Sequence, residues 1–114
     1  MNWIHLTDIS TIDQIIKDSF DKPQVIFKHS TRCSISLMAK RKFEFEWDSL
    51  PAETPVYFLD LLNYRSISNS IAELFNVHHE SPQLLLIKDG ECVYEASHSE
   101  ISAEDAAEQM TVNS

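Results

Sequence analysis

The segment KHSTRCSISLMAK, residues 28–40, places one cysteine where a strand is expected to end and a helix to begin. The first backbone N–H groups of a helix have no intrahelical partner and carry partial positive charge, so they stabilise a thiolate at Cys33. Lys28, His29 and Arg32 would add to this effect if their side chains turned towards the sulfur. The thiolate is the nucleophile in thiol–disulfide exchange. The position therefore favours a reactive cysteine over the alternative, a small buried residue.

Ser36 stands three residues after Cys33, where an enzyme with two cysteines would carry the second one. A second cysteine resolves the intermediate disulfide. With serine in its place, a disulfide formed at Cys33 would have no cysteine at that position to resolve it. The Ser36 hydroxyl could hydrogen-bond the thiolate, or Ser36 could be an ordinary first-turn serine.

The hydrophobic pattern divides the chain into strands and helices of a single domain, residues 1–114. In chain order the predicted elements are strand 3–6, a helix within 7–20 that starts near Ser10, strand 24–30, helix 33–48, strand 55–63, helix 65–77, two strands within 83–97 joined by a turn at Asp89-Gly90, and a helix from Ser102. The order β-α-β-α-β-α-β-β-α predicts an α/β fold. Its mixed sheet has parallel strands, an antiparallel closing hairpin and helices on both faces.

Ser81-Pro82 precedes the apolar run QLLLI. Proline cannot donate a hydrogen bond to a central ladder, so we place Pro82 at the start of a strand. Its peptide bond could be cis, as in a tight turn, or trans, as in most X-Pro bonds.

These features together resemble the thioredoxin superfamily along nearly the whole chain. The resemblance rests on the order of elements, a strand that leads to Cys-x-x-Ser, and the stretch ESPQLLLIKDGECVYE. It implies a thioredoxin-like fold in which strand 24–30 lies beside strand 83–88 and Pro82 faces Cys33. The backbone of Ser81 would then hold an incoming disulfide like an added strand.

Within that superfamily, FKHSTRCSIS is similar to the monothiol bacilliredoxins, the YtxJ-like family, whose signature is close to Thr-Cys-Pro-Ile-Ser. The matching residues are His29, Ser30, Thr31, Cys33, Ile35 and Ser36. Ser34 departs from the family, which has proline there, and the loss of proline's fixed φ could alter the ionisation of the thiol.

The resemblance implies a thiol–disulfide oxidoreductase that takes bacillithiol, a low-molecular-weight thiol, from S-thiolated client proteins. Bacillithiol or a similar thiol would be its co-substrate, with no tightly bound cofactor. Catalysis would rest on Cys33 and Ser36, and substrate would be bound by Thr31, Arg32, Ser34, Ser81 and Pro82. Arg32 and Lys28 could receive the carboxylates of a small thiol, or could merely offset an acidic surface.

Composition excludes several other classes of protein. A net charge of −9 repels phosphate backbones, so we expect no nucleic-acid partner. The sequence contains no apolar run of about 18 residues that could span a membrane, and its N-terminus lacks a secretory pattern, so we expect a cytoplasmic protein. We also expect it to be a monomer. The lone Gly90 excludes glycine-rich phosphate loops and argues against an iron–sulfur carrier like the glycine-containing monothiol glutaredoxins. The competing hypothesis is a thioredoxin-fold adaptor without catalysis.

Cys92 and two adjacent histidines are the other residues that could form a site. Strand alternation places Cys92 on the face of Tyr94 and Ala96, as a small apolar residue or, alternatively, a resolving thiol. His78 and His79 have no partner at metal-ligand spacing, so we expect no metal site.

Overall fold

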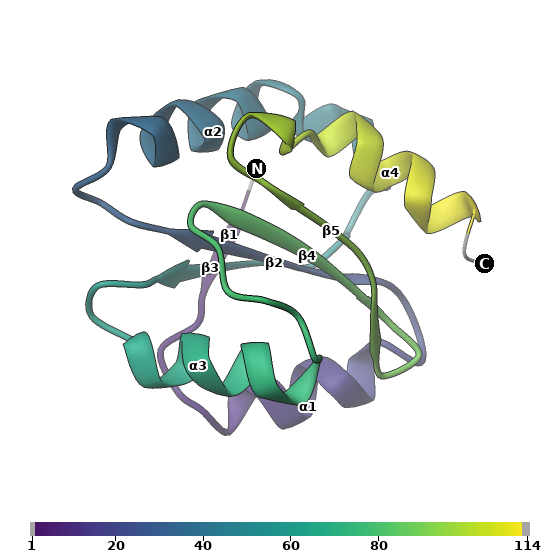
Figure 1. Cartoon of the computed structure of the whole chain (residues 1–114). Coiled ribbons are helices and arrows are strands. Elements are labelled where there is room, and N and C mark those ends of the chain that lie inside the picture. Colours follow the sequence, from purple (N-terminus) through teal and green to yellow (C-terminus); the bar gives the residue numbers. More distant parts are fainter. Residues whose placement is uncertain (1, 113–114) are drawn as a thin grey trace.

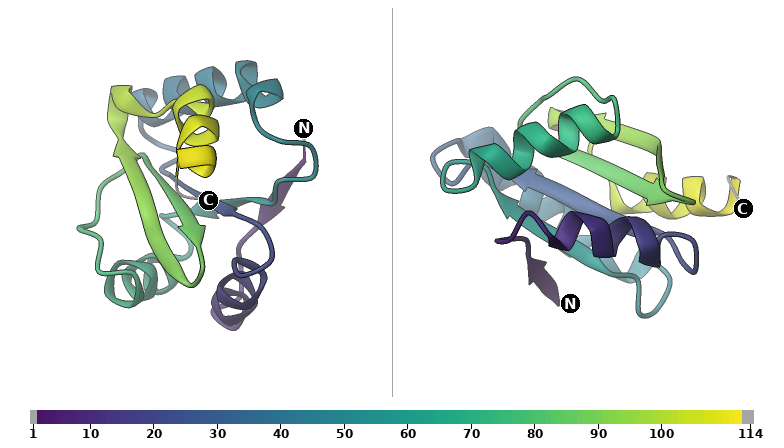
Figure 2. Two further views of the ribbon diagram at one scale, coloured as in Figure 1. Left: turned by 90° about the vertical axis from the view of Figure 1, so that its right-hand side faces the viewer. Right: turned by 90° about the horizontal axis from the view of Figure 1, so that it is seen from below.

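A computed structural model describes residues 2–112 and contains one five-stranded sheet between two layers of helices (Figure 1). The elements, in chain order, are β1 Trp3–His5, α1 Thr11–Asp18, β2 Gln24–His29, α2 Ser34–Phe45, the 3₁₀ turn η1 Trp47–Ser49, β3 Val56–Asp60, α3 Arg65–Leu74, β4 Gln83–Lys88, β5 Glu91–Ser97, the 3₁₀ turn η2 His98–Glu100 and α4 Ala103–Val112. Helices α2 and α4 cover one face of the sheet, and α1 and α3 cover the other (Figures 1 and 2).

The strand order is β1-β3-β2-β4-β5, so β2 lies beside β4, as the resemblance implied. β2 runs parallel to β3 and antiparallel to β4, and β5 closes the sheet as an antiparallel hairpin strand. Lys28 pairs with Gln83, so the end of β2 lies beside the start of β4. This register brings the chain that leads into Cys33 alongside the Ser81–Pro82 peptide.

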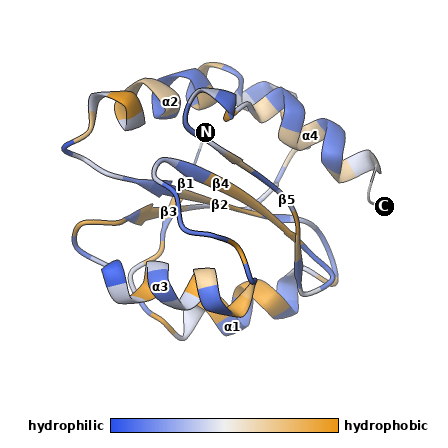
Figure 3. Cartoon of the chain, viewed as in Figure 1, coloured by the Kyte–Doolittle hydropathy of each residue, from blue (hydrophilic) through white to orange (hydrophobic). Residues whose placement is uncertain are grey.

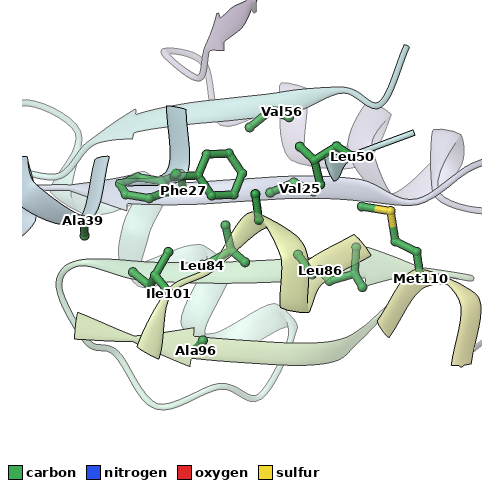
Figure 4. Packing of buried hydrophobic residues seen from close by; sticks show 13 residues of the cluster. Val25, Phe27, Ala39, Leu50, Val56, Leu84, Leu86, Ala96, Ile101 and Met110 are labelled. Carbon is green, nitrogen blue, oxygen red and sulfur yellow. The ribbon is translucent and has the colours of Figure 1, made fainter. Parts of the chain in front are cut away.

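Each face of the sheet packs its own apolar cluster, because β2 is buried on both sides. Val25 and Phe27 belong to the cluster under α2 and α4 (Figure 4), whereas Ile26 belongs to the cluster over α1 and α3. Because both faces of β2 are covered, its middle residues 25–27 are all apolar instead of alternating with polar ones. Figure 3 shows this concentration of apolar residues in the central strands.

The observed elements are shorter than the predicted ones, and polar side chains explain where several of them end. The Asp60 carboxylate accepts hydrogen bonds from Leu62 N (3.2 Å) and Asn63 Nδ2 (2.7 Å), which turns the chain at the end of β3. Glu46 follows the last residue of α2, and its carboxylate accepts a hydrogen bond from Ala103 N (3.0 Å). This hydrogen bond caps α4. At the start of α1, the Ser10 hydroxyl bonds Asp8 instead of capping the helix.

The β4–β5 hairpin contains a bulge that the sequence pattern did not reveal. Leu86 pairs with Tyr94 but Ile87 pairs with Cys92, so Val93 is an extra residue. Cys92 therefore packs with Ile87 on the α1/α3 side of the sheet, and the prediction that it shares the face of Tyr94 and Ala96 is wrong. The Asp-Gly turn itself is confirmed, with φ of 53° at Asp89 and 79° at Gly90.

The helices of residues 2–112 are too short, or too polar, to cross a membrane. The longest, α2, has 12 residues, against the roughly 20 that a bilayer requires.

Candidate active site

Cys33 is the N-cap residue of α2 and is half-buried. Its backbone is extended, with φ −105° and ψ 121°, and its carbonyl accepts the hydrogen bond from Leu37 N (3.1 Å) that opens the helix. The first turn of α2 carries no acidic side chain and no side-chain cap. The partial positive charge of the helix end is therefore available to the sulfur.

The loop that leads into the helix exposes the residues on either side of the thiol. Thr31, Arg32 and Ser34 are exposed, as a surface that meets a substrate requires. Cys33 N–H donates to the Ser30 carbonyl (3.1 Å), which holds the turn immediately before the helix. Nothing in the structure tests whether these three side chains bind substrate, so that role stays a prediction.

The Ser81–Pro82 peptide bond is cis, the first of the two alternatives that the sequence left open. Pro82 is buried, and its carbonyl accepts a hydrogen bond from His98 N (3.1 Å), which ties η2 to this turn. The Ser81 hydroxyl oxygen is buried and has no hydrogen-bond partner among the described residues. The pairing of Lys28 with Gln83 places this turn at the same end of the sheet as the loop that carries Cys33.

Ser36 is fully buried, and its hydroxyl is engaged with the end of β2. Its Oγ accepts the Ser30 N–H (3.0 Å) and lies 2.7 Å from His29 Nδ1. The sequence suggested a hydrogen bond from Ser36 to Cys33, but the observed partners are His29 and Ser30. The hydroxyl thus fixes the β2–α2 loop that positions the thiol.

His29 was predicted only as a possible source of charge near the sulfur. It is 4% exposed and lies between the rings of Phe27 and Phe58. Burial, together with the nearby Lys40 ammonium, lowers the pKa of His29 below its usual value, while the Asp60 carboxylate opposes this. A neutral imidazole accepts at one nitrogen, so the Ser36 hydroxyl donates to Nδ1 when the ring proton is on Nε2.

Lys28 faces away from Cys33, so neither its contribution to thiolate stabilisation nor its contact with a small thiol is supported. Its side chain is fully buried on the α1/α3 side of the sheet, because alternation along β2 turns it opposite to Phe27 and His29. Its Nζ donates to the Ser68 carbonyl (3.3 Å) and lies 3.4 Å from His79 Nδ1. Burial lowers the pKa of Lys28 to about 8.

The remaining candidates lie apart from the thiol. Burial raises the pKa of Cys92 to about 11, and its S–H donates to the Tyr94 carbonyl (3.3 Å). His79 is turned towards Lys28 and Ser68, whereas His78 is exposed. Within residues 2–112, no three His, Cys, Asp or Glu side chains gather in a group that could hold a metal ion.

The fold and the site define a class of protein, a thiol oxidoreductase with a thioredoxin fold. The structure resembles a protein described as a candidate oxidoreductase with a thioredoxin fold, at 32% identity and a TM-score of 0.78, covering 94% of this chain and 92% of that one. Two thioredoxins share the fold. The one from Malassezia sympodialis has 20% identity and a TM-score of 0.74, covering 97% of this chain and 91% of that one. The one from Trypanosoma brucei brucei has 12% identity and a TM-score of 0.76, covering 98% of this chain and 90% of that one.

The family described as monothiol bacilliredoxin BrxC matches residues 4–106. The chain belongs to the monothiol bacilliredoxin family.

Proposed function

We propose that this protein removes a low-molecular-weight thiol from mixed disulfides on client proteins, by a monothiol mechanism at Cys33. The Cys33 thiolate attacks the small-thiol sulfur of client–S–S–R. The client leaves as a thiolate that takes up a proton, and Cys33–S–S–R is formed. A second small thiolate, R–S⁻, then attacks this adduct, releases R–S–S–R and regenerates the Cys33 thiolate. The client cysteine is reduced, and one small thiol is oxidised as it joins the transferred one in R–S–S–R.

The observation that carries the proposal is the isolation of Cys33 from any second thiol. Ser36 occupies the position of a resolving cysteine and is bonded to His29. Cys92, the other cysteine of the chain, is packed on the α1/α3 side of the sheet, whereas α2 lies on the opposite side. An adduct on Cys33 therefore has no internal thiol to resolve it and waits for an external one.

Membership of the bacilliredoxin family supports bacillithiol as the small thiol. Arg32, exposed and adjacent to Cys33 in sequence, supplies a guanidinium that pairs with carboxylates. The main chain at Ser81, beside the end of β2, would receive the client segment as an added strand. Ser34 stands where the family has proline. It is the first residue of α2, and no side chain caps the N-terminus of this helix.

The test is single-turnover transfer followed by intact-mass spectrometry. The protein is mixed with a peptide that carries bacillithiol on its one cysteine, and the reaction is quenched with acid. We expect the mass of bacillithiol on wild type and on Cys92→Ser, and none on Cys33→Ser. Free peptide thiol without any adduct on Cys33, or equal release by Cys33→Ser, would refute the mechanism. Binding of the peptide without transfer would indicate an adaptor instead.

A further inference from the structure

We infer that the apolar groove between α2 and η2 binds an extended client segment that carries apolar side chains next to its thiolated cysteine and a carboxylate about four residues away. The inference rests on the proposed function and names the class of client that the same site selects.

One face of α2 forms the first wall of this groove. Ile35 lies three and four residues before Met38 and Ala39, and these lie four and three residues before Lys42, which aligns the four on one side of a helix. The turn at His98–Ser99, with Ile101 beyond it, forms the other wall, and the cavity measures about 480 Å³. The groove is therefore built from two elements that the fold already holds together.

Both walls of the groove are connected to the segments that surround the thiol. Ile35 is two residues beyond Cys33, and the opposite wall is tied to the cis-proline turn by the hydrogen bond from His98 N to the Pro82 carbonyl. A chain whose disulfide lies at Cys33 would pass directly into the groove.

The groove keeps large apolar side chains in solvent. Met38 is 70% exposed and Ile35 is 56% exposed. The start of α2 stands out as apolar in Figure 3. Exposed apolar surface of this kind marks an interaction site when polar residues border it, and Lys42, His98 and Ser99 provide that border.

The charges along α2 indicate which charged group the bound client segment should carry at the end of the groove farthest from Cys33. The chain as a whole has a net charge of −9, yet the segment 32–42 holds four of its nine basic residues and no acidic one. Lys40 is paired with Glu44 at 2.8 Å. None of the ion pairs or hydrogen bonds described for residues 2–112 engages the Lys42 ammonium, which lines the groove. A carboxylate on the client would complement it.

The spacing follows from helix geometry. Lys42 lies nine residues beyond Cys33, which is about 13 Å along a helix axis at 1.5 Å per residue. An extended peptide advances about 3.3 Å per residue, so it covers that length in roughly four residues. The favoured carboxylate is therefore about four positions from the thiolated cysteine.

The experiment compares peptides with one bacillithiol-modified cysteine, a leucine two residues away, and Asp or Lys at a distance of two to seven residues on either side. For wild type we expect a rate ratio of about fivefold in favour of Asp over Lys, greatest near position four. Lys42→Glu should reverse the ratio, and Met38→Ser should remove the preference for leucine over serine. Lys17→Glu on α1 and Leu74→Ser on α3 are matched exposed controls and should keep both preferences.

Two failures are distinguishable. If all peptides react at one rate, and Lys42→Glu does not change the Asp/Lys ratio while Cys33 still accepts bacillithiol, the groove assignment is wrong and the proposed function stands. If Cys33 accepts bacillithiol from no peptide and from no small disulfide, the proposed function fails, and the inference that depends on it fails as well.

Discussion

Replacement of the buried Lys28 by methionine should stabilise the protein. Lys28 is fully buried, and burial lowers its pKa from 10.5 to about 8, so the fold pays a penalty for the ammonium at neutral pH. A pKa unit is worth about 1.4 kcal/mol, which makes that penalty roughly 3 kcal/mol. Methionine has a similar length and no charge, and it gives up only the long contacts to Ser68 and His79. We expect Lys28→Met to raise the free energy of unfolding at pH 7 by about 2 to 3 kcal/mol.

The pH dependence tests the cause of this gain. Between pH 8 and 10.5 the unfolded chain holds the Lys28 proton while the native protein has lost it, so this residue makes wild type more stable as pH rises. Cys92 acts in the opposite sense, because its native pKa is raised to about 11 from 9. Both proteins contain Cys92, so its contribution cancels in the difference between their free energies of unfolding. That difference should shrink by about 3 kcal/mol between pH 8 and 10.5.

The assay is urea unfolding at pH 7, 8, 9 and 10, with m-values compared to ensure that the same transition is followed. The exposed Lys17→Met is the control and should differ little from wild type at any pH. A Lys28→Met protein that is no more stable than wild type at pH 7, with a difference independent of pH, would refute the argument from burial.

Four further predictions concern the cap of α4, the second cysteine, and the Ser36 and His29 side chains that support the active-site loop. Glu46→Gln weakens a charge-assisted cap on α4, where Glu46 accepts from Ser102 Oγ (3.1 Å) and Ala103 N (3.0 Å), and should cost about 1 kcal/mol in thermal or urea unfolding; Asp48→Asn, on the exposed 3₁₀ turn, should not. Iodoacetamide at pH 7 should label Cys33 and leave Cys92 unmodified until urea unfolds the chain, since burial raises the pKa of Cys92 to about 11; comparable labelling of both in the native protein would show that Cys92 is accessible. Ser36→Ala leaves Ser30 N and His29 Nδ1 without their partner and should lower the free energy of unfolding by about 1 to 3 kcal/mol. Because the native pKa of His29 is lowered from 6.5, its contribution to stability is present above pH 6.5 and lost as pH falls through the native pKa. In urea unfolding between pH 7 and 5, His29→Gln should therefore reduce the loss of unfolding free energy with falling pH. The exposed His5→Gln is the control and should leave that loss unchanged.

The order of elements and the placement of Cys33 could be predicted because both depend on local pattern. The apolar run 25–27 within segment 24–30 indicated a buried strand, and the change of pattern at Cys33 indicated a helix start. Asp89-Gly90 identified the hairpin turn for the same reason, since its positive φ angles need those residue types.

The features that the sequence did not reveal depend on contacts between distant residues. The bulge at Val93 moves Cys92 to the other side of the sheet, and no pattern within β5 signals it. The contact between Ser36 and His29 joins a helix to a strand end across seven residues. Alternation along β2 was the one available signal, because it places His29 on the face of Phe27 and sends Lys28 to the opposite face.

The exposure of Ile35 and Met38 shows a limit of helical periodicity. The apolar residues of α2 extend around the helix beyond the side that meets the sheet. The sheet covers only the side that carries Ala39 and Phe43, so Ile35 and Met38 stay exposed. The sequence therefore identified the apolar residues of α2 without showing which of them remain in solvent beside the thiol.

The central claim is that Cys33 takes up a small thiol and holds it until an external thiol removes it. The most direct measurement is the intact mass of the protein isolated from its own cells after oxidative stress, with acid quenching before lysis. We predict an added mass on Cys33 that equals a small cellular thiol and that disappears when excess small thiol is added. An unmodified Cys33, or a modification confined to Cys92, would contradict the account.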